Sequence, residues 1–183
     1  MAAGLVVPIS GPDIGLWGGS NALPPVGGNA LGTQNDDGFV LSCSFQGQEV
    51  NASDAYGLTL VEAIYRGENW RLRFTGLEWN RTGLLNLMQM FGQVLAGTFA
   101  PLLKNIGDRW TSYCTSLQLT SILSSPAPSY PNTLTAFTAG LAPNSQTSGM
   151  WTSKLREMPL DMVLFPYQTT INGVSVVVPF VTA

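Results

Sequence analysis

The 183-residue chain contains no histidine. Without histidine, Ser-His-Asp and Cys-His catalysis are excluded, most zinc sites lose their usual ligand, and the common charge switch near neutral pH is missing. The sequence also lacks a phosphate-binding P-loop and a dinucleotide-binding glycine motif. Two acidic pairs, Glu62 with Glu68 and Glu157 with Asp161, have no sequence feature that places either pair in one cleft. We therefore expect no enzyme activity, no cofactor and no metal site.

Charged residues are scarce. They make up 10% of the chain, whereas 45% of its residues are hydrophobic, and an ordinary soluble domain has roughly 25% charged residues. A subunit with so few charges exposes uncharged and apolar surface, which usually marks a site of association. The net charge of -3 at pH 7 argues against a surface that grips nucleic acid, because phosphate contacts need clustered Lys and Arg.

The sequence offers no targeting or membrane segment. The N-terminus has no basic residues followed by a long apolar core, so we expect no signal peptide. The stretch between Arg81 and Lys104 is uncharged, but it contains Gly, Asn, Gln and Pro residues that make it a poor membrane span.

Glycine, proline and asparagine are concentrated in residues 1–37. This segment shows neither helical nor alternating periodicity, so we expect an extended arm, followed by a β domain over residues 38–183. A structureless segment of this length is uncommon inside a compact domain, and its apolar residues favour folding onto a partner. Trp17 is therefore a candidate interface residue.

Alternating apolar and polar residues predict strands along much of the remaining chain. A glycine-containing turn is predicted at residues 66–69, a bulge at Gly76 and a second turn at Gly173. Cys43 and Cys114 each lie in an apolar strand-like run, which favours two buried free thiols, with a disulfide as the alternative. The predicted strand segments are residues 38–45, 48–53, 70–79, 112–123, 133–141 and 158–167, with a final run after Gly173.

One segment predicts a helix. Thr82 suits an N-cap position, and Gly97 or Pro101 suits the end of the helix. Between them, apolar residues recur with helical spacing and form a single stripe, so we expect a mainly β protein with one flanking helix. The stripe consists of Leu84, Leu87, Met88, Phe91 and Leu95.

Much of the scarce charge is placed in two short clusters. Arg71 and Arg73 fall on one face of a predicted strand, where they are either solvated or paired with carboxylates of another subunit. We predict that both clusters lie at subunit boundaries, because the placement of charge gives specificity more than affinity; ordinary surface charge is the alternative. One cluster is Arg66, Glu68, Arg71 and Arg73, and the other is Lys154, Arg156 and Glu157.

The order of these parts between Gly38 and Tyr167 resembles the tail tube proteins of tailed bacteriophages. In that family an early strand is followed by an acidic, Tyr-Gly-containing segment, and a second strand that ends in Leu-Glu leads into a helix. A late strand begins with an Arg-x-x-Pro-Leu pattern. The matching residues in this chain are Asp54, Tyr56, Gly57, Val61, Glu62, Gly67, Leu77, Glu78, Arg156, Pro159 and Leu160.

The resemblance implies a two-sheet β-sandwich or barrel with a flanking helix. It also implies hexameric rings whose inner sheets join into one barrel, stacked into a hollow tube through which DNA passes. The implied partners are copies of the chain and other tail proteins, such as a terminator, baseplate or sheath protein. The implied location is the phage virion, after synthesis in the host bacterial cytoplasm. A capsid decoration protein, a head-tail connector and a carbohydrate-binding β domain remain the alternatives.

Overall fold

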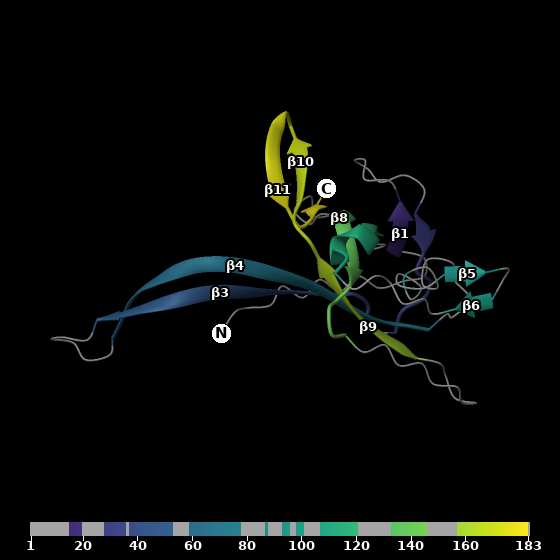
Figure 1. The fold of residues 1–183 in the computed structure, drawn as a ribbon, viewed down its shortest axis with the longest axis horizontal. Helices are drawn as coiled ribbons and strands as arrows, with labels where there is room; N and C mark the ends of the chain where they lie inside the picture. The colour runs from purple at the N-terminus through teal and green to yellow at the C-terminus, as the bar shows by residue number, and fades with distance from the viewer. Residues whose placement is uncertain are drawn as a thin grey trace, which may run out of the picture.

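The computed structural model is mainly β (Figure 1). It describes residues 15–19, 28–35, 37–52, 59–77, 87, 93–95, 98–100, 107–120, 133–145 and 157–182. One short 3₁₀ helix, η1 (Trp110–Tyr113), accompanies the strands. The strands are β1 (Gly15–Gly19), β2 (Asn29–Ala30), β3 (Val40–Ala52), β4 (Thr59–Gly76), β5 (Gln93–Leu95), β6 (Thr98–Ala100), β7 (Thr115–Thr120), β8 (Thr133–Leu141), β9 (Met158–Leu164), β10 (Tyr167–Ile171), β11 (Val174–Val178) and β12 (Val181–Thr182).

Eight strands form one antiparallel sheet in the order β2-β1-β7-β8-β9-β4-β3, with β12 paired to β8. β9 pairs with residues 139–141 of β8, whereas β12 pairs with residues 134–135 of the same strand. The pairs β10–β11 and β5–β6 form two small separate sheets. The mainly β prediction is confirmed, and β7, β8 and β9 lie within the segments predicted as strands.

One face of the large sheet is buried around an apolar cluster. On β4, Leu72 and Phe74 are 1% and 4% exposed, while the intervening Arg73 lies on the opposite, solvent-facing side. This is the alternation of a strand whose successive side chains point to opposite faces. Phe39 packs against Phe74 with ring centroids 4.8 Å apart. The periodicity predicted for residues 70–76 is therefore confirmed; at Gly76 the strand ends, where the sequence predicted a bulge.

The described part of residues 1–37 is not an arm, which corrects the sequence-based expectation. β1 pairs with both β2 and β7 inside the large sheet, and Trp17 is 6% exposed in the core of its own chain. Gly15 lies at a close approach: a Cβ there would lie 2.9 Å from the side chains of Leu31 and Phe39, so these fully buried side chains would have to shift. Periodicity did not predict this strand, because three of the five residues of β1 are glycine and leave no alternating pattern.

The predicted helix lies mostly outside the described residues. Leu87, from its apolar stripe, is described and fully buried. At the end of the stripe, Leu95 belongs to β5, which pairs with β6, so the prediction that the helix includes this residue is wrong. The residues that form this strand pair include Val94, Thr98 and Phe99, whose β-branched or aromatic side chains favour strands. In the described part of the chain, no helix is long and apolar enough to span a membrane.

β3 and β4 continue far beyond the sheet as a two-stranded ribbon (Figure 1). β9 pairs only with residues 70–76 of β4, so residues 44–52 and 59–69, called the ribbon below, have no third strand. The turn predicted at residues 66–69 is wrong, because β4 runs through it. Gln46 pairs with Gly67 and Gly47 pairs with Tyr65, which leaves Arg66 as the extra residue of a β-bulge. The glycine that suggested a turn has a φ of 135° at this bulge.

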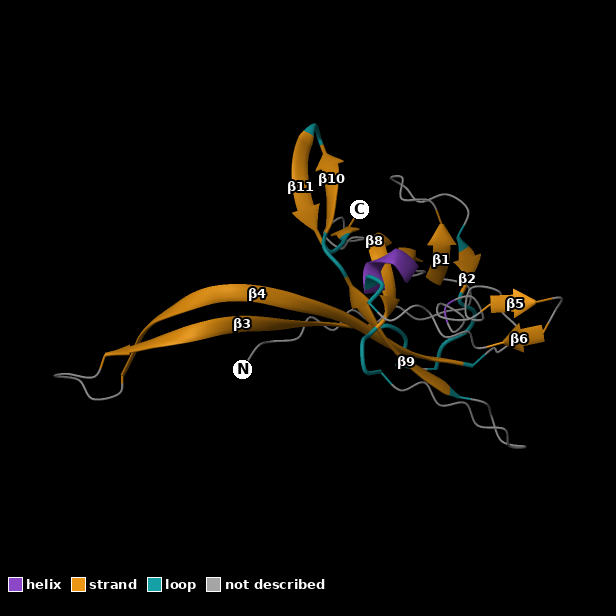
Figure 2. Ribbon diagram, in the orientation of Figure 1, coloured by secondary structure: helices purple, strands orange, loops and turns teal. Residues whose placement is uncertain are grey.

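β10 and β11 form a second projecting hairpin, separate from the ribbon (Figure 2). Its turn residues Asn172 and Gly173 have φ values of 50° and 80°. Positive φ at both central positions is typical of the type I′ turn, which matches the twist of the two strands. The turn predicted at Gly173 is confirmed. The predicted strand at residues 158–167 is divided in two, because β9 ends at Leu164 and β10 begins at Tyr167.

Candidate subunit interfaces

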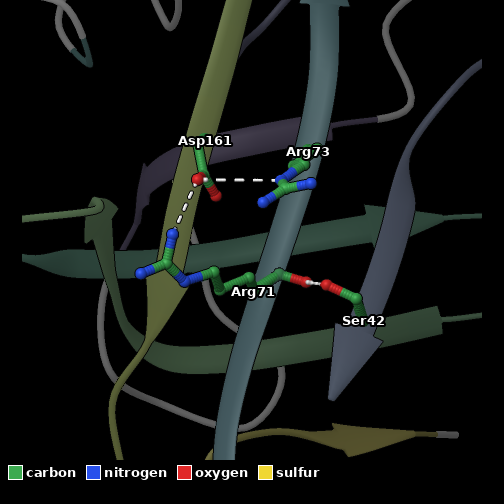
Figure 3. Close-up of polar contacts among 4 residues, drawn as sticks. All are labelled: Ser42, Arg71, Arg73 and Asp161. Atoms are coloured by element: carbon green, nitrogen blue, oxygen red, sulfur yellow. Dashed lines mark hydrogen bonds and ion pairs between the residues drawn. The ribbon is translucent and has the colours of Figure 1, made fainter. Parts of the chain in front are cut away.

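The predicted arginine pair on β4 meets a carboxylate of its own chain (Figure 3). Arg71 Nη1 lies 2.9 Å from Asp161 Oδ2, and Arg73 Nε lies 3.7 Å from the same oxygen. Arg73 is the direct cross-strand partner of Asp161, and Arg71 is two residues further along the same face. The Ser42 hydroxyl donates to the backbone oxygen of Arg71 at 3.4 Å, which ties β3 to this group.

The sequence left two alternatives open for these arginines, solvation or pairing with carboxylates of another subunit, and the structure adds a third: a carboxylate of the same chain. The Asp161 side chain is 22% exposed and the Arg71 side chain 35% exposed, so their pair helps to fix the register of β4 on β9. Arg73 is 63% exposed, and its longer contact leaves most of the guanidinium in solvent. Sequence reasoning did not foresee the pairing, because cross-strand register depends on strand order.

A shallow groove of about 490 Å³ lies beside this ion-pair group, on the side of β4 and β9 that faces away from the core. Its polar lining includes Asn35, Asp37 and Arg73. The Asn35 side chain donates to Asp37 Oδ2 at 3.0 Å, which holds the edge of the groove. No group of three or more acidic or thiol side chains that would hold a metal ion occurs among the described residues.

The other residues of the first predicted cluster lie on the ribbon. Arg66 and Glu68 are exposed, and Arg66 Nη2 donates to the Gln48 side chain across the two strands. Desolvation, and then the charge and hydrogen bond of Glu68, raise the pKa of Tyr65 above its ordinary value. The predicted cluster is therefore split in two. Arg71 and Arg73 lie on the large sheet, whereas Arg66 and Glu68 lie on the ribbon.

The second predicted cluster is described only in part. Glu157 is exposed directly before β9, while Lys154 and Arg156 lie outside the described residues. Glu157 and Asp161 stand four strand positions apart, and the Asp161 carboxylate is engaged by Arg71. A span of four strand residues is about 13 Å, so they do not form a paired-carboxylate site.

Exposed apolar side chains are the interface feature that sequence reasoning missed. They gather on the two projecting hairpins, where no third strand covers them. Every described side chain from Ser44 to Val50 and from Glu62 to Arg66 is exposed. Alternation predicted that Phe45 would share the buried face of Leu41, and only the length of the ribbon makes it exposed. In the described part of the chain, the exposed large hydrophobic residues are Phe45, Val50, Ile64, Tyr65, Val174 and Val177.

Both cysteines are free thiols, so the favoured prediction of unpaired cysteines is confirmed, but they are half-buried and not buried as predicted. Burial raises the pKa of Cys114 to about 11. Desolvation, and then the Glu68 charge, raise the pKa of Cys43 above its ordinary value. Because the thiolate is the reactive form, these shifts favour inert thiols over nucleophiles.

Comparison with known proteins adds no relative: no protein-family model and no curated protein sequence matches this chain.

Proposed function

We propose that this chain is a virion structural protein, a subunit of a bacteriophage tail tube that assembles with its own copies into stacked hexameric rings around a hollow lumen. The observation that carries the proposal is the pair of projecting hairpins with exposed apolar side chains. They belong to a chain in which only 10% of the residues are charged. The order of sequence elements that resembles tail tube proteins gives the type of assembly, including its two-sheet architecture and its symmetry.

The ribbon supports an assembling subunit on physical grounds. A two-stranded hairpin is marginally stable in water by itself, and a long free edge strand is a template for pairing with another chain. Proteins that stay monomeric usually protect such edges with Lys, Pro or several charges. β3 spans thirteen residues and contains neither Lys nor Pro, and Glu49 is its only charged residue.

Assembly with other copies also explains the scarcity of charged residues. When most of a subunit's surface becomes interface, charged residues are depleted, because a buried unpaired charge is costly. The net charge of -3 also suits a lumen through which DNA must move without sticking, since like charges repel. The charged residues around Lys154 and Arg156 would then fix the register between neighbouring copies.

Negative-stain electron microscopy of the purified protein over a concentration series tests the proposal. Hollow rings with six-fold symmetry, stacking into tubes as concentration rises, are the expected result. Trimers, or assembly only on capsids, would point instead to a decoration protein. In the same assay, Arg156→Glu is expected to impair ring stacking, and unchanged assembly would remove the role assigned to that cluster.

A further inference from the structure

The two faces of the ribbon differ in character. On the face that continues from the core, Cys43 pairs with Trp70 and Phe45 pairs with Glu68. Beyond the bulge, Tyr65 returns to this face opposite Gly47. Phe45 and Tyr65 are 59% and 63% exposed, so the face that is apolar in the sheet continues onto the ribbon with two exposed aromatic side chains, beside the exposed carboxylates Glu68 and Glu49. We call this the aromatic face of the ribbon.

The opposite face of the ribbon is mostly polar. Ser44 pairs with Asn69 and Gln46 pairs with Gly67. Gln48 accepts a hydrogen bond from Arg66 across the ribbon. Its exposed apolar residues are Ile64, at 47%, and Val50, at 36%. Covering this face would take several polar side chains and the Arg66 charge out of water, which is costly.

The β10–β11 hairpin has the same asymmetry. One face carries three cross-strand pairs without a charge, and Val174, at its outer end, is 62% exposed. The other face is mostly polar, with Gln168 donating to the Ser175 hydroxyl at 3.1 Å, and its one apolar residue is Val177, which is 65% exposed. At the base of the apolar face, Tyr167 stacks on Phe137 with ring centroids 5.2 Å apart. The pairs of the apolar face are Tyr167 with Val178, Thr169 with Val176, and Ile171 with Val174.

In the described part of one copy, Phe45, Tyr65 and Val174 stay exposed, whereas the other five residues of the β10–β11 apolar face are half-buried. β10 and β11 form a sheet of their own, and the ribbon has no third strand. The two hairpins leave the body in different directions, the ribbon along the long axis and β10–β11 across it (Figure 1). The described part of the chain thus carries two apolar faces with exposed side chains, and these faces do not reach each other.

We infer that the apolar face of β10–β11 in one copy packs on the aromatic face of the ribbon in a second copy. The occupant is a second copy of the same chain, because each copy exposes apolar side chains on both of these hairpin faces. Residues 167–178 contain no charged side chain, so this hairpin brings no charge of its own to Phe45 and Tyr65; the charges of the aromatic face itself are Glu68 and, beyond Tyr65 at its outer end, Glu49. Glu68, the charge nearest to them, is hydrogen-bonded to Tyr65, which lowers the cost of covering it.

Such a contact is head-to-tail, because each copy gives its hairpin on one side and its ribbon on the other. Head-to-tail contacts repeat, and they form a closed ring when the rotation between copies closes. The inference deepens the proposed function and rests on it for the closed geometry. The contact between the two hairpins is a separate claim that can be tested alone.

Site-directed cross-linking tests the contact. Two populations of full-length protein are made in a background with Cys43→Ser and Cys114→Ser. One carries Tyr65→Cys and the other Val174→Cys. They are mixed in equal amounts and treated with a short bis-maleimide. We expect the mixed dimer to form roughly tenfold more than in the control pair, because weak random encounters lack the affinity of a docked pair.

The control pair keeps the same hairpins but uses their other faces. It carries Ile64→Cys and Val177→Cys, at positions that are 47% and 65% exposed. Equal cross-linking in the two mixtures would overturn the inference. Rings without the specific cross-link would leave the tube proposal standing and remove this contact. The specific cross-link in dimers or open chains would support the contact and contradict the tube.

A second variant pair keeps both native cysteines. Phe45→Ser is expected to weaken self-association roughly tenfold or more, as removal of a central aromatic contact does. Val50→Ser, on the opposite face of the same strand, is expected to leave association unchanged. Sedimentation velocity measures both, and circular dichroism shows that each variant is folded. A Phe45→Ser protein that is folded and associates like the wild type would contradict the inference.

Discussion

Truncation of Trp17 separates a core role from an interface role for the N-terminal segment. Trp17 lies in β1, 6% exposed, and its neighbours in the sheet are Asn29 of β2 and Leu117 of β7. If it belongs to the core, Trp17→Ala lowers the stability of the isolated subunit. If it instead served mainly as a contact for another copy, the same substitution would weaken assembly and leave the free energy of unfolding unchanged.

The expected magnitude follows from the area that is buried. A tryptophan buries about 150–250 Å², which corresponds to about 4–6 kcal/mol at roughly 25 cal/mol per Å². Since part of that area is buried in the unfolded chain, Trp17→Ala should cost about 3–5 kcal/mol. Trp17→Phe should cost roughly 1–2 kcal/mol. The indole N–H has no hydrogen-bond partner among the described residues, so phenylalanine loses only volume.

Urea unfolding at a concentration where the protein is monomeric measures these values. Tryptophan fluorescence reports the transition, because the other four tryptophans remain in both variants. The Trp17→Phe variant serves as the matched control. A Trp17→Ala protein whose unfolding free energy stays within about 0.5 kcal/mol of the wild type, the usual range for surface substitutions, would refute the core assignment.

Three further predictions concern the sheet and the thiols. Gly15→Ala should destabilise the fold by about 1–3 kcal/mol, because its Cβ would lie 2.9 Å from Leu31 Cδ1; a normal midpoint in urea would disprove the close approach. Asp161→Asn should cost roughly 1–2 kcal/mol by removing the ion pairs with the two arginines of β4, and raised salt should reduce the difference between variant and wild type. Cys43 should react with iodoacetamide faster than Cys114 at pH 8, because a pKa of about 11 leaves Cys114 almost entirely protonated; peptide mass spectrometry shows which thiol is modified. The Cys114 rate should rise about tenfold per pH unit up to its pKa, and a plateau near pH 8 would contradict the burial of this thiol.

Strand periodicity predicted the central part of the fold well. Leu72 and Phe74 alternate with the arginines of β4, and the apolar positions are buried as expected. Strand periodicity gave wrong predictions in two segments that contain glycine. In β1, glycines erase the alternation of a buried strand, and in β4, Gly67 suggested a turn although it stands at a bulge.

The candidate interfaces were harder to predict, because they depend on the position of each residue relative to the body. Phe45 and Leu41 have the same place in the alternating pattern, yet one is 59% exposed and the other 4%. Only the point at which β9 ends separates them. Likewise, the partner of Arg71 lies 90 residues away on β9, and no local pattern reveals that contact. The scarcity of charge, in contrast, was readable from composition and agrees with the uncovered hairpins.

Sedimentation velocity of the wild-type protein over a concentration series tests most directly whether this chain assembles with its own copies. We expect monomer to convert into a discrete large species, with the sedimentation coefficient of a closed ring, and then into larger stacks. A single monomeric species that persists to high concentration would contradict the account, because the apolar faces of both hairpins would then remain in water.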